Sequence, residues 1–132
     1  MSFQVGQTAE VTKSFDKLSV ESFAKLSEDF NPVHLDEDFA KQTQFGGTIV
    51  HGMLLSSLIS GLLGYKMPGS GAIYLGQELK FKRPVYVGDE VTAKVEITHI
   101  REDKPIAKIA TQVLDKDGKL CVDGEAVVML PV

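Results

Sequence analysis

The stretch that decides the fold is Thr48-Ile49-Val50-His51-Gly52-Met53-Leu54-Leu55-Ser56-Ser57-Leu58-Ile59-Ser60-Gly61-Leu62-Leu63-Gly64. Its side chains are apolar around nearly the whole circumference of a helix, with small Ser and Gly residues interspersed, and such a helix is buried. We expect it to begin near His51 and to end at Gly64, a common C-terminal stop, after about 20 Å at 1.5 Å of rise per residue. His51, Gly52 and several serines interrupt the stretch, which is also too short to span a bilayer.

From Ala72 onward the apolar residues recur with a period of two, which is typical of strands with one face in solvent. We expect antiparallel strands in the segments 73–82, 91–98, 107–113 and 120–130, with a hairpin turn at Asp115-Lys116-Asp117-Gly118. A further strand is expected from Thr8 to Phe15. This gives roughly five strands, near the usual size of a sheet.

We expect the helix to pack on the sheet, because the apolar face of an antiparallel sheet must be covered and only this helix is available to cover it. The sequence therefore predicts an α+β protein with a hot-dog fold, in which the sheet wraps around a long central helix. At 132 residues the whole chain, 1–132, is expected to be one domain. The helix is apolar on more sides than one sheet covers, so we expect a symmetric homodimer.

The candidate site lies upstream, in Ser27-Glu28-Asp29-Phe30-Asn31-Pro32-Val33-His34. A helix is expected from about Ser19, its N-cap, to Glu28. Pro32 ends the helical path, because it lacks a backbone N–H and pushes the preceding residue out of the α region. Asp29 and His34 can then converge on one water and exchange a proton with it. The alternative is that Asp29 caps a turn and His34 is an ordinary histidine.

Composition and charge narrow the class of protein. The net charge of −4 does not favour nucleic-acid binding, which needs a basic surface. With a single cysteine, Cys121, and no charged-then-apolar leader, we expect a cytoplasmic protein. We considered a metal site formed by His34, Asp36, Asp38 and His51, but no pair of these has a diagnostic spacing. We therefore expect no metal, and we interpret the acidic residues as a solvated helix start.

Five segments together are similar to a known family: Ser27 to His34, Ile49-Val50-His51-Gly52-Met53, Ile73-Tyr74-Leu75-Gly76-Gln77, Pro84-Val85-Tyr86-Val87-Gly88-Asp89 and Arg101-Glu102-Asp103-Lys104-Pro105. The chain resembles the (R)-specific enoyl-CoA hydratases of the MaoC-like hot-dog superfamily. The resemblance covers essentially the whole chain and is strongest to the short hydratases that feed polyhydroxyalkanoate synthesis. Family members often have Gly before the aspartate, where this chain has Glu28.

The resemblance implies roles for particular residues. Asp29 and His34 would bind the water that adds across the double bond, and which of them is the base stays open. Asn31 would support the site by hydrogen bonding. The N–H of Gly52 would bind the thioester carbonyl, where negative charge develops during addition. No metal or redox cofactor is needed.

Other residues are candidates for binding the acyl-CoA thioester. Ser60, Leu63 and Val128 resemble the positions that bound the acyl tail in the family, and ordinary core packing is the alternative for each. Lys82 belongs to a local basic cluster with Lys80 and Arg83, which is a candidate for contact with the phosphates of coenzyme A. The alternative for these cations is simple solubilisation of a strand.

The resemblance therefore implies that the protein is a hydro-lyase, which converts trans-2-enoyl-CoA and water to (R)-3-hydroxyacyl-CoA. Two alternatives remain open from the sequence. A hot-dog thioesterase would direct water at the carbonyl carbon and release free thiol. A non-catalytic acyl-thioester binding protein or subunit scaffold would be insensitive to replacement of Asp29 or His34.

Overall fold

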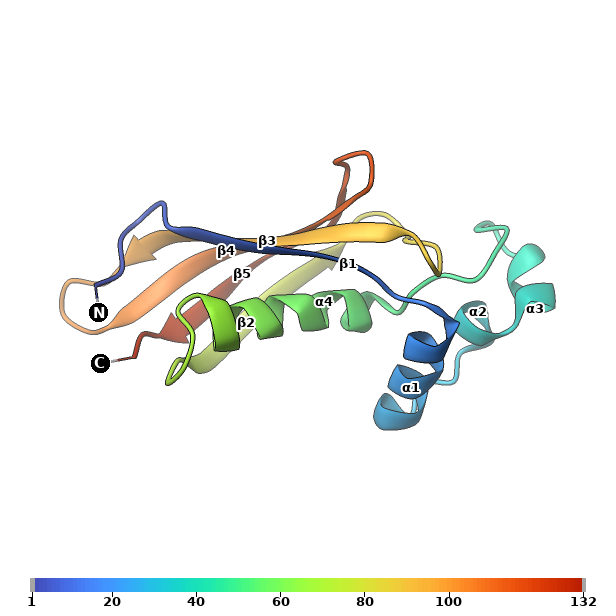
Figure 1. Cartoon of the computed structure of the whole chain (residues 1–132), viewed down its shortest axis with the longest axis horizontal. Helices are drawn as coiled ribbons and strands as arrows, with labels where there is room; N and C mark the ends of the chain where they lie inside the picture. The colour runs from blue at the N-terminus through green and yellow to red at the C-terminus, as the bar shows by residue number, and fades with distance from the viewer. Residues whose placement is uncertain (1, 132) are drawn as a thin grey trace.

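A five-stranded antiparallel sheet curves around one central helix in the computed structural model, which describes residues 2–131 (Figure 1). The elements follow the order β1 (Thr8–Ser14), α1 (Lys17–Ser27), α2 (Pro32–Leu35), α3 (Glu37–Lys41), α4 (Gly52–Gly61), η1 (Leu62–Lys66), β2 (Ile73–Phe81), β3 (Glu90–Ile100), β4 (Ile106–Asp115) and β5 (Leu120–Met129). This arrangement confirms the predicted α+β hot-dog fold. Within residues 2–131, no helix is both long enough and apolar enough to cross a membrane.

The strands are arranged in the order β1-β3-β4-β5-β2, so that β1 and β2 form the two edges of the sheet. The three central strands show the expected alternation, and their inward residues form the floor of the core. These are Val91, Ala93, Val95, Ile97, Ala107, Ile109, Val113, Val122, Ala126 and Val128. The hairpin between β4 and β5 is also confirmed, with Gly118 at a φ of +78°. Such a φ favours glycine because it lacks a Cβ.

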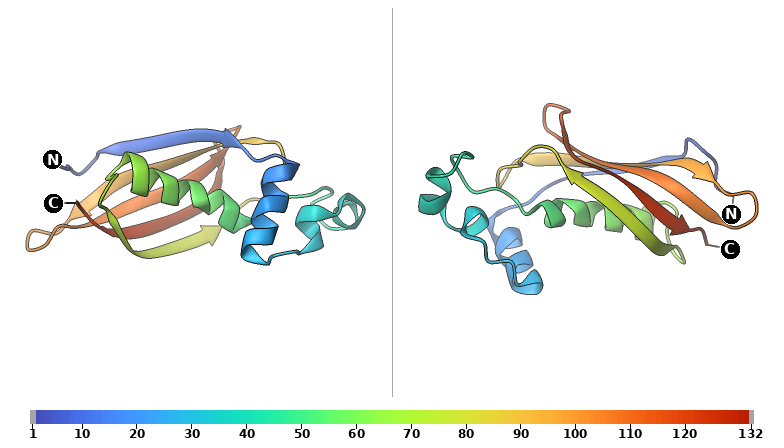
Figure 2. Two further views of the ribbon diagram at one scale, coloured as in Figure 1. Left: turned by 60° about the horizontal axis from the view of Figure 1, so that its bottom comes forward. Right: turned by 180° about the vertical axis from the view of Figure 1, so that it is seen from behind.

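Helix α4 lies across the inner face of the sheet and supplies the other half of the core (Figure 2). Leu54, Leu55 and Ile59 are buried on α4. The predicted helix is confirmed, but its last turn is wider than expected. After Gly61 the chain forms the π-helical turn η1, in which the N–H of Met67 donates to the carbonyl of Leu62 at 2.8 Å. The apolar stretch continues through this turn.

Helix α1 begins two residues earlier than predicted, and the prediction of Ser19 as its N-cap is wrong. Asp16 is the cap, since its Oδ1 accepts a hydrogen bond from the N–H of Ser19 at 2.8 Å. A carboxylate in this position satisfies an N–H that the helix leaves free. That hydrogen bond also lowers the pKa of Asp16. The helices α1, α2 and α3 lie together beyond the end of the sheet, near the N-terminus of α4 (Figure 2).

Replacement of Ile59 by alanine tests how much stability comes from the burial of α4. Ile59 is 1% exposed within the core. We expect Ile59→Ala to lower the free energy of unfolding by about 2–5 kcal/mol, because it removes buried methylenes and leaves a cavity. Chemical denaturation monitored by circular dichroism gives this value. The matched control is Leu26→Ala on α1, where the side chain is 85% exposed and the expected change is within about 0.5 kcal/mol. Equal losses in the two variants would contradict this account of the core.

Candidate active site

The chain turns sharply between α1 and α2, and side-chain hydrogen bonds hold the turn. Glu28 has a φ of +67°, which ends α1 in the left-handed region. The Oδ1 of Asp29 accepts from the N–H of Asn31 at 3.2 Å. The Oδ1 of Asn31 accepts from the N–H of Val33 at 3.2 Å and caps α2, with Pro32 as its first residue. Asn31 therefore supports the local backbone, and the break at Pro32 places His34 on a new helical turn.

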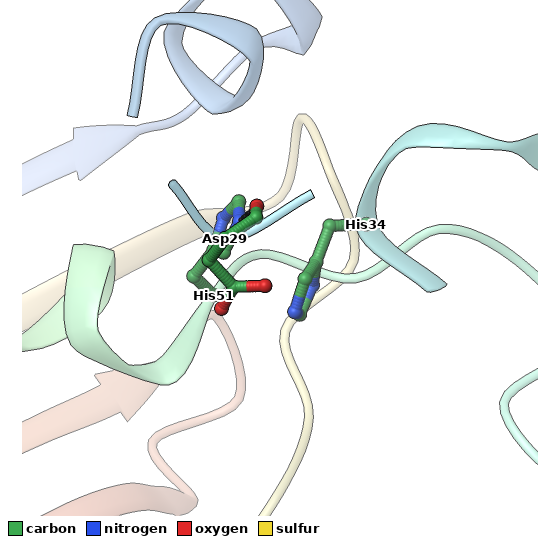
Figure 3. A group of neighbouring side chains, drawn as sticks. All are labelled: Asp29, His34 and His51. Carbon is green, nitrogen blue, oxygen red and sulfur yellow. Dashed lines mark hydrogen bonds between the residues drawn. The ribbon is translucent and has the colours of Figure 1, made fainter. Parts of the chain in front are cut away.

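Asp29 and His34 converge as expected from the break at Pro32, and His51 joins them (Figure 3). One potential ligand atom from each of these three side chains lies within 4.8 Å of the other two. Asp29 is exposed and His34 is half-buried, so both are accessible. The interpretation of Asp29 as a turn cap is also correct, because one carboxylate oxygen accepts from Asn31. A carboxylate has two oxygens, so capping and water binding are compatible.

The tautomer of His34 follows from its hydrogen bond to the backbone carbonyl of Ile49. Its Nδ1 lies 2.7 Å from the carbonyl oxygen of Ile49. A carbonyl only accepts hydrogen bonds, so Nδ1 carries the proton. In the neutral ring, Nε2 then has a free lone pair. This nitrogen is the one available to take a proton from water.

His51 precedes α4 and is 2% exposed. Its Nε2 lies 3.1 Å from the backbone carbonyl oxygen of Asp29, to which it donates. Its ring stacks on His34, with centroids 3.9 Å apart and an interplanar angle of 26°. Burial lowers the pKa of His51 below 6.5. From the sequence, His51 was considered only as a member of a metal set, and its position beside Gly52 was the one signal that it lies at the site.

A cavity of about 390 Å³ opens in front of these residues. Asp29, His34, His51 and Gly52 line it, and Lys82 and Arg83 lie on its wall together with Phe45, Ile49, Val50, Met53, Leu55, Phe81, Pro84, Val85 and Val122. Its lining is mostly apolar with a few polar groups, which is typical of small-molecule sites. The aromatic residues Phe45 and Phe81 were not singled out from the sequence, because an apolar residue in a strand or loop has no distinctive pattern.

The ring of Phe81 lies so close to Gly52 that a side chain at position 52 would force the ring or the backbone to move. A Cβ at this position would lie 2.6 Å from both Cδ1 and Cε1 of Phe81. Gly52 is also the first residue of α4, where a backbone N–H has no partner within the helix. The absence of a side chain lets the cavity reach the helix terminus.

The three residues expected at the acyl tail lie apart from this cavity. Ser60 is exposed near the C-terminal end of α4, whereas Leu63 and Val128 are buried in the core at 2% and 0% exposure. None of them lines the 390 Å³ cavity. Their role as the boundary of a tail stays a prediction.

The metal set considered from the sequence does not come together. The Oδ1 of Asp36 accepts from the N–H of Phe39 at 3.1 Å and caps α3, while Asp38 lies in the first turn of that helix. Asp29, His34 and His51 are close enough to share an ion. One ring nitrogen of each histidine donates to a backbone carbonyl, which leaves the Nε2 of His34 and the Nδ1 of His51 as the remaining ring nitrogens. The cluster shares only His34 and His51 with the set considered from the sequence.

Comparison with known proteins places these features in a family. Residues 3–117 match the model of the MaoC like domain. The chain is 61% identical over 130 residues to the (R)-specific enoyl-CoA hydratase of Aeromonas caviae, covering 98% of this chain and 97% of that protein. It is 44% identical to the (R)-specific enoyl-CoA hydratase of Rhodospirillum rubrum, covering 96% and 87%. The solved structure of the A. caviae (R)-hydratase involved in PHA biosynthesis superimposes with a TM-score of 0.97, covering 98% of each chain. The unliganded R-hydratase PhaJ1 of Pseudomonas aeruginosa, 45% identical, gives 0.93, covering 98% and 83%.

The contact between Gly52 and Phe81 is testable by a double-mutant cycle. We expect Gly52→Ala to lower the free energy of unfolding by about 1–3 kcal/mol, because the new methyl overlaps the ring. In a Phe81→Ala background most of this loss should disappear, and denaturation curves of the four proteins measure the difference. Gly61→Ala is the control, since a Cβ there meets no atom within 4 Å. Strictly additive losses for Gly52 and Phe81 would contradict the contact.

Proposed function

The chain belongs to the MaoC-like domain family, and from this membership we propose that it is an (R)-specific enoyl-CoA hydratase. It adds water to a trans-2-enoyl-CoA to give the (R)-3-hydroxyacyl-CoA, a hydro-lyase reaction. The stereochemistry is supported by the two (R)-specific hydratases to which it is 61% and 44% identical. The observation that carries the proposal is the convergence of Asp29 and His34 on one cavity at the start of α4.

In the proposed mechanism, Asp29 and His34 hold a single water against the β-carbon of the substrate. The Nε2 of His34 is available to accept a proton from this water, since Nδ1 donates to Ile49. As the oxygen of this water bonds to the β-carbon, one of its protons passes to the Nε2 of His34. Asp29 orients the water, and the proton held by His34 is returned through Asp29 to the α-carbon on the same side, so that the π bond of the substrate is replaced by one C–O and one C–H bond. The net change is addition of H and OH, with no redox step or cofactor.

The backbone N–H of Gly52 stabilises the carbonyl oxygen of the thioester, where negative charge develops as water attacks. This N–H belongs to the first turn of α4, so the positive end of the helix dipole acts in the same direction. A single donor of this kind is worth about 2.7–4 kcal/mol in enzymes that stabilise an oxyanion. Because Gly52 has no Cβ, the ring of Phe81 can lie close to this first turn of α4.

The rest of the substrate extends in two directions from this point. Lys82 and Arg83 lie on the cavity wall, and we assign them to the phosphates of coenzyme A. The acyl tail would follow α4 from Leu55 toward Ser60, Leu63 and Val128. By analogy with the hydratase involved in PHA biosynthesis, we propose that the product supplies monomers for polyhydroxyalkanoate synthesis.

We also propose that the protein is cytoplasmic. The thiol of Cys121 is buried and free, which fits a reducing compartment such as the cytoplasm.

We also propose that the protein is a homodimer that pairs through β2. The two edges of the sheet differ in chemistry. The edge strand β1 exposes mainly polar residues such as Glu10 and Lys13, which discourage pairing. The edge strand β2 exposes Ile73, Tyr74 and Leu75 at 52%, 42% and 49%. Antiparallel pairing of two β2 edges would cover these side chains by one symmetric contact.

Crotonyl-CoA hydration tests the catalytic proposal. We expect Asp29→Asn and His34→Ala each to lower kcat by about 10²- to 10⁴-fold, because each removes a group that handles the proton. The loss of absorbance of the conjugated thioester measures the rate, and chiral analysis of the product should give the (R) isomer. Glu28→Gln, which changes the adjacent carboxylate, should retain the wild-type rate. Full activity in Asp29→Asn, or release of free thiol without loss of conjugation, would contradict hydration by this site.

Sedimentation analysis tests the proposed dimer. The wild type should sediment at about twice the 14.4 kDa of one chain. We expect the double variant Ile73→Lys/Leu75→Lys to be monomeric, because each chain would bring two charges into the symmetric contact, where they would be buried without partners. Leu26→Lys, at an 85% exposed position on α1, should stay dimeric. A dimer that persists in the double variant would show that β2 is not the interface.

A further inference from the structure

The buried histidine at the start of α4 has no role in the reaction described above. His51 is one of the few buried polar residues of the described chain, and it lies against both groups that are assigned to the water. We propose that His51 is a positioning residue: as a neutral imidazole it fixes Asp29 through that residue's backbone carbonyl and supports the ring of His34 by stacking. This inference rests on the proposed hydratase function and assigns a residue that it left unused.

The first step of the argument is the hydrogen bond to Asp29. The Nε2 of His51 donates to the carbonyl oxygen of Asp29 at 3.1 Å, across 22 residues of sequence. Asp29 lies in an exposed turn between two helices, which is otherwise held by short-range bonds to Ser27 and Asn31. The bond from His51 therefore ties the backbone of Asp29 to the N-cap residue of α4. It holds the residue that carries the carboxylate next to the residue that precedes Gly52.

The second step is the stacking on His34. The two rings face each other with centroids 3.9 Å apart, while Phe23 packs edge-on against His51 at 4.8 Å. The ring of His34 is thus held between the carbonyl of Ile49 at its Nδ1 and the face of His51. Because these two contacts restrict the rotation of the ring, the Nε2 of His34 keeps a fixed orientation at the cavity.

The third step concerns charge. With Nε2 bound to a carbonyl, a second proton on His51 would sit on Nδ1, which is buried and has no hydrogen-bond partner among the described residues. A buried charge without a partner is costly, and two stacked imidazolium rings would repel each other. His51 therefore stays neutral and leaves the proton of the reaction to His34. The lowered pKa of His51, caused mainly by burial, agrees with this assignment.

Three substitutions separate the positioning role from simple packing. Gln places an amide N–H close to the position of the ring Nε2–H, whereas Leu and Phe fill the space without a donor. We expect His51→Leu and His51→Phe to lower kcat for crotonyl-CoA by at least 30-fold, with KM within threefold of wild type. His51→Gln should recover kcat to within about fivefold of wild type. Phe23→Leu loosens the packing against the same ring and should lower the melting temperature, with kcat within threefold.

The outcomes distinguish this inference from the proposed function. An inactive wild type would overturn the hydratase assignment itself. An active wild type with a His51→Leu or His51→Phe variant of full kcat would overturn only the role of His51, and so would failure of Gln to do better than Leu. Imidazole nitrogen NMR of the wild type gives a readout that does not depend on activity or on the folding of a variant. It should show a neutral ring with the proton on Nε2 at pH 7; a proton on Nδ1 would contradict the proposal.

Discussion

The structure depends on one constraint: the apolar face of α4 that carries Leu54, Leu55 and Ile59 must be covered by the sheet. The sheet covers α4 along its length, and the buried residues from Leu54 to Leu63 anchor it there. An anchored helix has a fixed N-terminus, so the free N–H groups of its first turn point at a constant position. The site is built at this terminus, which makes the packing of the core a condition for the chemistry.

A second segment has to be brought to that terminus, and three long-range hydrogen bonds do this. His34 donates to the carbonyl of Ile49, and His51 donates to the carbonyl of Asp29. The third is a backbone bond, in which the N–H of Ile49 donates to the carbonyl of Val33 at 3.2 Å. Together they fix both water-binding side chains to the backbone that also carries Gly52. The site is therefore assembled from residues 29–34 and 49–52 as one unit.

The sequence predicted those features that depend on periodicity or on one special residue. The apolar helix, the period-two strands and the hairpin at Gly118 were predictable because burial imposes a repeat. The convergence of Asp29 and His34 was predictable because Pro32 prevents a straight helix. The N-cap of α1 was placed wrongly because both Asp16 and Ser19 have capping side chains, and only backbone conformation distinguishes them. The role of Phe81 against Gly52 depends on an approach between distant segments, which leaves no local signal.

The two stacked histidines show why residue type alone does not assign chemistry. His34 and His51 are the same side chain with the same intrinsic basicity, and each donates one hydrogen bond to a carbonyl. They differ in what surrounds the second nitrogen. His34 is half-buried on the cavity, whereas the second nitrogen of His51 is enclosed without a partner. Water can therefore stabilise a proton on the second nitrogen of His34 but not on that of His51. This difference in solvent access makes His34 the proton acceptor and leaves His51 as a neutral hydrogen-bond donor.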